Sequence, residues 1–259
     1  MNAFITGANR GIGRGIARVL ADAGYDIAFT YGSAQEEAKE AHAEITAKGS
    51  RCFYYQASLE NPDVPAEVTR RAISDLGGID AVICNAALSK FGTVLDGDIS
   101  LLDYLYALNY RAYILCAREA AKDMIARKSP GNIVFISSTR GDRAYAEDTF
   151  YGAMKAALHL SAQSMALELA KHNIRVNSAA PGATEIRGDF SPEQLSRGAF
   201  AKNIPLGRRG SPDEVGHLVK YIISPEAGYM TGNIIKLDGG LILPGMPESD
   251  ELYERLRQD

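Results

Sequence analysis

Short apolar runs alternate with longer amphipathic stretches along most of the chain. Runs such as Val82-Ile83-Cys84 are apolar at every position, which is typical of strands covered on both faces. We expect strands at 3–6, 27–30, 52–55, 81–84, 132–137, 174–179 and 234–237. We expect helices at 16–23, 34–48, 62–76, 99–127, 150–172 and from 211 onward. Strands that alternate with helices in this way predict an α/β fold, in which a doubly wound parallel sheet forms the middle of three layers.

The sequence shows no boundary between domains. No linker, low-complexity tract or long run of like charges divides its 259 residues, so we expect one domain over 1–259. The longest stretch without clear periodicity is 183–210, and a loop of that length in a compact domain is usually functional. We therefore expect a substrate loop around 183–210. The tail over 248–259 is highly charged, which predicts a surface position.

Composition argues against several classes of function. Hydrophobic residues make up 46% of the chain, charged residues 23%, and the formal net charge is −4, so no concentrated basic face for nucleic acid is expected. The three cysteines are widely spaced and the four histidines form no metal-binding pattern, which predicts neither a disulfide framework nor a metal site. No signal-peptide pattern and no apolar run of roughly 18 residues is present, so we expect a cytoplasmic protein that does not enter a membrane.

A glycine-rich turn follows the first predicted strand. Gly7, Gly11 and Gly13 lie between that strand and the first helix, where backbone N–H groups and the helix N-terminus face an anion. Their spacing differs from the common G-x-G-x-x-G fingerprint, and a tight structural turn would use glycine too. The position after the first strand favours binding of a dinucleotide pyrophosphate.

The second predicted strand indicates which dinucleotide is bound. A site for NAD usually carries an acid about 20 residues after the glycine turn, where it binds the ribose 2′-hydroxyl. Here that strand ends in Thr30-Tyr31-Gly32-Ser33, without an acid. Together with Arg10 in the glycine turn, this favours NADP(H) over NAD(H), although Arg10 also suits an exposed turn.

Tyr151 and Lys155 are the candidate catalytic pair. They are four residues apart, so a helix places both side chains on one face. A lysine cation near a phenol lowers the phenol pKa from its free value of about 10, which lets the phenol exchange a proton at working pH. The same spacing is also common on exposed helix faces, so the pair needs a site around it.

Further motifs stand around this pair in a definite order. They are Thr6-Gly7-x-x-x-Gly11-x-Gly13, Asn85-Ala86, Asn109, Ser138, Tyr151-x-x-x-Lys155, Pro181-Gly182 and Asp238-Gly239-Gly240. In this order and spacing, from about residue 2 to 243, the chain resembles the shorter single-domain branch of the short-chain dehydrogenase/reductase family, which includes 3-oxoacyl reductases and glucose dehydrogenases. The resemblance implies a seven-stranded Rossmann-type sheet with strand order 3-2-1-4-5-6-7. It also implies a homotetramer or homodimer.

The resemblance assigns roles to individual residues. Ser138 would bind the substrate oxygen, Tyr151 would be the acid or base, Lys155 would lower the pKa of Tyr151 and hold the nicotinamide ribose, and Asn109 would keep a water that relays protons. The implied cofactor residues are Gly7, Asn9, Arg10, Gly11, Ile12, Gly13, Tyr31, Ser58, Leu59, Asn85, Ala86, Tyr151, Lys155, Pro181, Gly182 and Thr184.

Two positions depart from the family pattern. Ala87 stands where glycine is usual, and Ser58 stands where an aspartate commonly binds the adenine. Both leave the proton relay intact but put the affinity for the cofactor in doubt.

We therefore expect an NADP(H)-dependent oxidoreductase that interconverts a carbonyl and a secondary alcohol of a small molecule. The alternative is a non-catalytic NADP-binding sensor, but such proteins tend to lose the tyrosine or the lysine. The substrate is a sugar or polyol, or a 3-oxoacyl thioester, with a steroid-like alcohol also open. A polar substrate is favoured by charged residues among the pocket candidates, although these residues would also suit a solvent-facing rim: Phe91, Arg140, Arg143, Tyr145, Glu147, Asp148, Glu185 and Arg187.

Overall fold

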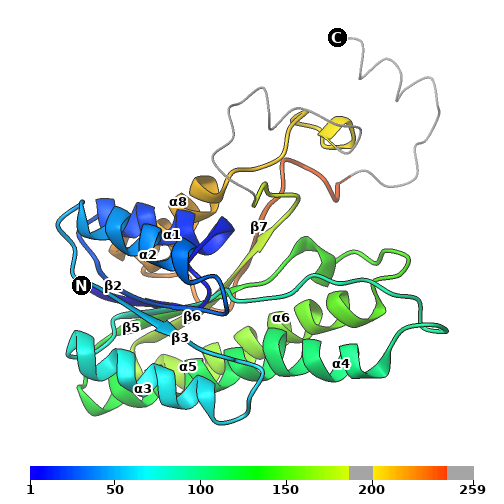
Figure 1. Ribbon diagram of the computed structural model, residues 1–259. Coiled ribbons are helices and arrows are strands. Elements are labelled where there is room, and N and C mark those ends of the chain that lie inside the picture. Colours follow the sequence, from blue (N-terminus) through cyan, green and yellow to red (C-terminus); the bar gives the residue numbers. More distant parts are fainter. Residues whose placement is uncertain (187–200, 244–259) are drawn as a thin grey trace.

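Seven parallel strands form the centre of the molecule. The computed structural model describes residues 1–186 and 201–243 (Figure 1). The order across the sheet is β3-β2-β1-β4-β5-β6-β7, and every neighbouring pair is parallel. The predicted α/β class and strand order are therefore confirmed. The strands are β1 (Asn2–Ile5), β2 (Asp26–Tyr31), β3 (Cys52–Gln56), β4 (Ala81–Cys84), β5 (Gly131–Ile136), β6 (Ile174–Pro181) and β7 (Ile234–Leu237).

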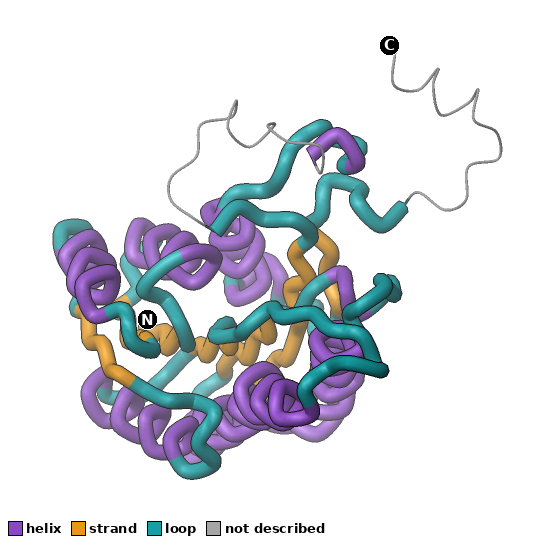
Figure 2. Tube along the Cα trace, turned by 45° about the vertical axis from the view of Figure 1, so that its right-hand side comes forward, coloured by secondary structure: helices purple, strands orange, loops and turns teal. Residues whose placement is uncertain are grey.

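Helices cover both faces of the sheet and complete the three layers, which stay separate in the rotated view (Figure 2). One face is covered by α1 (Gly11–Asp22), α2 (Gln35–Thr46) and α8 (Pro212–Ile223). The other is covered by α3 (Val64–Leu76), α4 (Ile99–Tyr106), α5 (Ala112–Ala126) and α6 (Thr149–Leu169).

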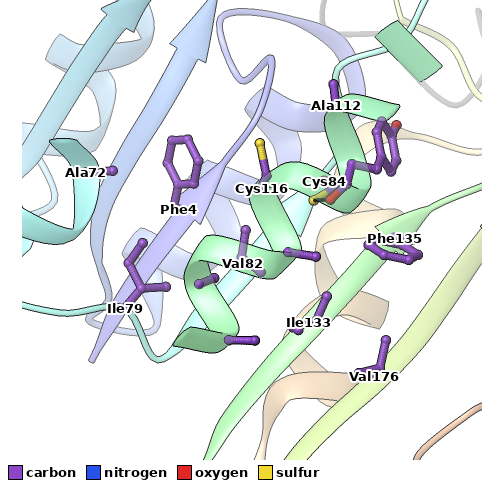
Figure 3. Packing of buried hydrophobic residues seen from close by; sticks show 14 of the residues in the cluster. Phe4, Ala72, Ile79, Val82, Cys84, Ala112, Cys116, Ile133, Phe135 and Val176 are labelled. Carbon is purple, nitrogen blue, oxygen red and sulfur yellow. Dashed lines mark hydrogen bonds between the residues drawn. The ribbon is translucent and has the colours of Figure 1, made fainter. Parts of the chain in front are cut away.

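The central strands supply two separate cores because successive side chains of a strand point to opposite faces. Phe4, Val82 and Ile133 belong to the core on the side of α3, α5 and α6 (Figure 3). Ile5 and Ile83 belong to the core under α1 and α8. Both cores are apolar, which explains why these strands are apolar at every position.

The helix predicted over 99–127 is interrupted. A π-helical segment, η1 (Ala107–Arg111), joins α4 to α5. Such a segment adds one residue to a turn, which hydrophobic spacing does not reveal. Asn109 lies at its centre, so the irregularity coincides with a predicted site residue.

Helices α1 and α8 pack closely although they come from opposite ends of the chain. A Cβ on Gly15 of α1 would lie 2.5 Å from the backbone carbonyl carbon of Pro212, so only glycine permits this approach. Arg18 of α1 also donates to Asp213 of α8 at 2.7 Å. These contacts fix the start of α1, and with it the glycine turn, against the sheet.

The chain leaves β1 and β4 in opposite directions. The connection after β1 leads to α1 on one face, and the connection after β4 leads to α4 on the other. Neighbouring strands of this kind leave a crevice at their carboxyl ends, where ligands bind.

Residues 187–200 and 244–259 lie outside the described residues. The middle of the predicted substrate loop, including Arg187, and the charged tail fall there. Within 1–186 and 201–243, no helix is long and apolar enough to cross a membrane. In the same ranges, no group of three His, Cys, Asp or Glu residues could hold a metal ion.

Candidate active site

A cleft of about 610 Å³ opens at the carboxyl edge of the sheet. It is lined by segments that follow β1 and β4, the strands at which the connections diverge. The glycine turn and the predicted catalytic residues Ser138, Tyr151 and Lys155 all line this one cleft. The residues that the sequence predicts for binding and for chemistry are therefore within reach of one ligand.

The glycine turn needs each of its three glycines. Gly7 (φ +69°) and Gly11 (φ +55°) have left-handed backbone conformations, which other residues adopt only with strain. A Cβ on Gly13 would lie 2.2 Å from the carbonyl oxygen of Gly7. The result is a bare backbone cradle at the N-terminus of α1, which fits a pyrophosphate group.

Asn85 and Thr6 tie this turn to the end of β4. Thr6 Oγ1 accepts hydrogen bonds from the N–H groups of Asn85 (2.8 Å) and Ala86 (3.0 Å). Asn85 Nδ2 donates to the carbonyl oxygens of Thr6 and Gly7, both at 2.9 Å. The Gly7 N–H donates a hydrogen bond to Thr30 Oγ1 at 3.0 Å. Asn85 thus connects the end of β4 to the glycine turn after β1.

An acid lies beside the glycine turn although β2 ends without one. Glu37 of α2 accepts a hydrogen bond from Asn9 Nδ2 at 2.8 Å. Its other oxygen lies 3.7 Å from Nη1 of the exposed Arg10. The Glu37 carboxylate therefore pairs with Arg10, the cation that favoured NADP(H) over NAD(H) in the sequence. Glu37 lies six positions past the end of β2, whereas the acid typical of NAD sites is expected at the strand end itself.

Ser138 and Tyr151 meet in the cleft. Ser138 lies two residues past the end of β5, and Tyr151 lies in the first turn of α6. Ser138 lies near enough to lower the pKa of the Tyr151 phenol, which burial, the largest influence, raises. Ser138 Oγ also accepts from the N–H of Arg140 at 3.2 Å. Two hydroxyl-bearing side chains from different elements thus line the same cleft.

Lys155 is buried beneath this pair, with 1% of its surface exposed. Its Nζ donates to the carbonyl oxygen of Ile136 at 2.9 Å and to Tyr113 Oη at 3.4 Å. It lies 5.6 Å from the centre of the Tyr151 ring. Burial lowers the pKa of Lys155 to about 7, because the charged ammonium loses its water.

The expected effect of Lys155 on Tyr151 is not found. The pKa of Tyr151 is raised to about 12, chiefly by burial and next by the carboxylate of Asp148, while Arg140 and Ser138 act to lower it. Lys155 is not among these influences in the structure described, so the implied lowering of the Tyr151 pKa by Lys155 stays a prediction. The reason is that Lys155 points its Nζ at Ile136 and Tyr113, while its own charged form is disfavoured by burial.

Asn109 is fully buried and does not line the cleft. Its Oδ1 accepts from the N–H of Leu88 at 2.9 Å, and its Nδ2 donates to the carbonyl oxygen of Leu88 at 2.8 Å. The side chain thus fixes the segment after β4, which does line the cleft. The implied proton relay at Asn109 stays a prediction.

Ser137 also lines the cleft, but its hydroxyl is engaged elsewhere. Ser137 Oγ lies 3.0 Å from His159 Nε2 and donates to the carbonyl oxygen of Ala179 at 3.2 Å. His159 in turn approaches Asp142 at 3.2 Å, and burial lowers the pKa of this histidine. These contacts leave Ser138 as the serine of this segment whose hydroxyl is available to a substrate in the cleft.

Most residues predicted for the site line the cleft: Gly7, Asn9, Arg10, Gly11, Ile12, Gly13, Tyr31, Leu59, Asn85, Ala86, Ser138, Tyr151, Lys155, Gly182 and Thr184. Ser58, Pro181 and Asn109 are not among its lining residues. Arg140 lines it too, among the charged pocket candidates.

Sequence reasoning missed Glu37 and Tyr113. A search of the first turn of the helix after β2 could have found Glu37. Asn9 and Arg10 in the glycine turn are polar residues that an acid there can bind. Tyr113 carries no such signal, because its contact with Lys155 joins residues 42 positions apart.

Known proteins resemble the chain over nearly its whole length. The family model described as enoyl-(acyl carrier protein) reductase matches residues 7–242. An L-rhamnose 1-dehydrogenase (NAD(P)(+)) of Sphingomonas sp. (strain SKA58) is 31% identical over 240 residues, which cover 92% of this chain and 94% of that protein. The 3-oxoacyl-[acyl-carrier-protein] reductase FabG of Staphylococcus aureus is 31% identical over 247 residues, covering 93% and 98%.

Solved structures of other proteins also match the fold over nearly its whole length. The acetoin dehydrogenase YohF of Salmonella typhimurium superposes with a TM-score of 0.90 at 30% identity, covering 95% of this chain and 98% of that one. A short-chain dehydrogenase/reductase from Serratia marcescens gives a TM-score of 0.85 at 28% identity. The chain belongs to the short-chain dehydrogenase/reductase family, and it is an NAD(P)-dependent oxidoreductase that acts on a carbonyl or alcohol group of a small molecule.

Proposed function

We propose that the chain interconverts a ketone and a secondary alcohol, with Tyr151 as general acid in reduction and general base in oxidation. The observation that carries this proposal is that Ser138 and Tyr151 line the same cleft, with the Nζ of the buried Lys155 5.6 Å from the centre of the Tyr151 ring. Two hydroxyl donors aimed at one point stabilise the negative charge that grows on a carbonyl oxygen during reduction.

Four residues of the site have separate roles in this proposal. A bound nicotinamide dinucleotide supplies or accepts the hydride. Ser138 holds the substrate oxygen by a hydrogen bond, and Tyr151 gives that oxygen its proton. Lys155 holds the nicotinamide ribose, and its positive charge favours the ionised form of the Tyr151 phenol. Asn109 fixes the segment after β4 and serves the relay that returns a proton to Tyr151.

We propose NADP(H) as the preferred cofactor. Two features support this choice: β2 ends without an acid, and Arg10 stands exposed at the edge of the cleft. Glu37 opposes it, because its carboxylate lies 3.7 Å from Arg10 and would repel a 2′-phosphate there. The preference therefore depends on whether Arg10 leaves Glu37 for the phosphate.

The proposed substrate is a small neutral polar molecule, such as a sugar, a polyol or a hydroxy ketone. Arg140, which lines the cleft, already has its charge paired with Asp148 at 2.7 Å, so it does not call for an anionic substrate. The names of the rhamnose and acetoin dehydrogenases among the similar proteins support this class.

A 3-oxoacyl thioester is the second candidate. The similarity to the Staphylococcus aureus reductase favours it. The segment after β4 also exposes Phe91, Val94 and Leu95, along which an acyl chain could lie.

We further propose that the chain over 1–259 is a single domain that works as a cytoplasmic homotetramer or homodimer. Leu160 and Leu167 on α6 are 67% and 84% exposed, and such apolar side chains favour burial against another copy. Sedimentation equilibrium of the purified chain tests this assembly.

The decisive experiment combines a substrate panel with the Tyr151→Phe variant. Carbonyls and alcohols from each class are offered with NADPH and with NADH, and turnover is read from the absorbance of the reduced cofactor. Tyr151→Phe should lower kcat about 10²–10⁴-fold, because it removes the proton donor. Its affinity for the cofactor should stay nearly unchanged.

Tyr106→Phe is the matched control, since Tyr106 is exposed on α4 and does not line the cleft. It should keep the parent rate. A Tyr151→Phe variant that turns over at the parent rate would refute the assigned role. A parent that binds NADPH but turns over no member of the panel would favour the sensor alternative.

A further inference from the structure

An ion pair between the partly exposed Arg140 and the buried Asp148 lies beside Tyr151 and has no part in the mechanism above. Arg140 Nη1 donates to Asp148 Oδ2 at 2.7 Å. Arg140 comes from the segment after β5, two residues past Ser138, and Asp148 directly precedes α6. The pair thus joins the two elements that carry the two hydroxyl groups of the site.

Asp148 is only 6% exposed and is held in place by two contacts. One oxygen takes the hydrogen bond from Arg140. The other accepts from the N–H of Gly152 at 3.2 Å, which caps the N-terminus of α6. Tyr151 sits in this capped turn, so the carboxylate is fixed close to the phenol.

Arg140 is held just as firmly. Its guanidinium carbon lies 4.5 Å from the ring centre of Phe91 and 4.4 Å from that of Tyr145, distances typical of cation–π contacts. Phe91 in turn meets Tyr151 edge-on, at 6.2 Å between ring centres. The cation therefore stands at a fixed place near the phenol and close to its counterion.

Other groups face Tyr151 from neighbouring elements. Lys155 lies one turn along α6, with its Nζ bonded to Ile136, and Tyr113 lies on α5 and is kept neutral by burial, which raises its pKa. Burial is the main cause of the raised pKa of Tyr151; Asp148 also raises it, while Arg140 and Ser138 lower it. The carboxylate and the guanidinium therefore act on the phenol in opposite directions.

Resting on the proposed role of Tyr151, we propose that Arg140 and Asp148 are a positioning pair for this residue. Asp148 fixes the first turn of α6 so that Tyr151 meets Ser138. Arg140 offsets the negative charge that this cap places beside the phenol, so that the phenol can still lose its proton during alcohol oxidation. Neither residue touches the reacting atoms in this proposal.

Four variants separate the two charges. Asp148→Asn removes the negative charge but keeps a side-chain oxygen for the Gly152 N–H, and asparagine caps helices as well as aspartate does. Arg140→Met removes the positive charge and keeps an apolar side chain between Phe91 and Tyr145. The double variant removes both, and Arg140→Lys keeps the charge.

The first measurement needs no turnover. The Cζ resonance of Tyr151, in protein labelled at tyrosine Cζ and assigned with Tyr151→Phe, is followed by carbon NMR as the pH rises. In Asp148→Asn the resonance should titrate about one pH unit below the parent, because a nearby like charge has gone. In the double variant it should move back upward, because the cation has gone too.

The second measurement is the pH profile of kcat for alcohol oxidation. The rising limb should move to lower pH in Asp148→Asn and to higher pH in Arg140→Met. It should return toward the parent in the double variant and stay with the parent in Arg140→Lys. KM should change little in any of them.

The outcomes that overturn the proposal are distinct. If Tyr151 titrates no lower in Asp148→Asn than in the parent, including the case in which neither titrates before unfolding, the charge of Asp148 does not act on the phenol. A raised KM in Arg140→Met with an unmoved pH profile would make Arg140 a substrate-binding residue instead. Because the NMR shift does not depend on turnover, an idle enzyme would refute the proposed function without deciding this pair.

Discussion

At the scale of single residues, burial decides the protonation of the site more than the neighbouring charges do. Lys155 and Tyr151 lie within one turn of α6, yet burial is the largest influence on both pKa values. It favours the neutral form of each, so it lowers the pKa of the lysine and raises that of the phenol. The Tyr-x-x-x-Lys spacing predicts proximity correctly but does not predict how much water reaches the two groups.

Replacing Lys155 by methionine should stabilise the fold at low pH. The folded pKa of Lys155 is about 7, below the unfolded value of 10.5, so the unfolded chain binds an extra proton between these two pH values. The free energy of unfolding of the parent therefore rises with pH across this window, and below it the lysine costs the fold several kcal/mol at most. Urea unfolding at about pH 6 and about pH 9 measures the difference.

The gain from Lys155→Met should be larger at the lower pH and should shrink at the higher one. Lys171→Met, at an exposed position after α6, should show no such pH dependence. Equal effects of Lys155→Met at both pH values would show that the ammonium is not disfavoured in the fold.

Replacing Glu37 by glutamine should strengthen the preference for NADPH. The change removes a carboxylate that lies 3.7 Å from Arg10, and the guanidinium then becomes available to a 2′-phosphate. The amide can still accept the hydrogen bond from Asn9. For a partly exposed ion pair we expect about a fivefold gain in the ratio of NADPH to NADH affinity, measured by calorimetric titration.

Glu36→Gln serves as the matched control, because Glu36 is the adjacent acid of α2 and pairs with Lys39 at 2.8 Å. It should leave the ratio unchanged. A Glu37→Gln variant with an unchanged ratio would mean that Glu37 does not compete for Arg10 at the cofactor site.

At the scale of elements, close contacts between backbones set the position of the glycine turn. α1 starts inside the turn at Gly11, and its next turn packs on α8 at Gly15. The sequence motif ends at Gly13, so it does not mark Gly15, whose partner lies at the other end of the chain. The site thus depends on a contact that no local pattern reveals.

Replacing Gly15 by alanine should destabilise the protein. Its Cβ would lie 2.5 Å from the carbonyl carbon of Pro212, and backbone at that distance has to shift. Overpacking of this kind costs about 1–3 kcal/mol, measured as a lower urea midpoint with an unchanged m-value. Gly32→Ala is the control, because its Cβ would meet nothing within 4 Å and should leave the midpoint nearly unchanged.

At the scale of the whole molecule, strand order and site position could be predicted, but the charges around the site could not. Alternation of apolar runs and helices, together with the order of the motifs, predicts the sheet and brings Ser138, Tyr151 and Lys155 to its carboxyl edge. Glu37 and Tyr113 act across contacts between distant segments, so their roles appear only when the elements are packed.

The same distinction explains the interrupted helix. The π turn around Asn109 leaves the apolar spacing of 99–127 almost unchanged, since both α4 and α5 pack on the same face of the sheet. What it changes is the direction of one buried amide, which reaches Leu88. Hydrophobic periodicity predicts which face of a helix is buried, but it does not predict the orientation of a single side chain such as Asn109.

The contact between α1 and α8 also orders events in time. Arg18 and Asp213 are 195 residues apart, so α1 is made long before its partner. At roughly 5–20 residues per second, a ribosome needs on the order of 10–40 seconds to bridge that interval. Throughout it, the apolar side of α1 has no α8 to cover it, and the nascent chain must be shielded from its neighbours. The glycine turn is thus among the first parts of the protein to be synthesised, but the helix that follows it gains its partner α8 only near the end of synthesis.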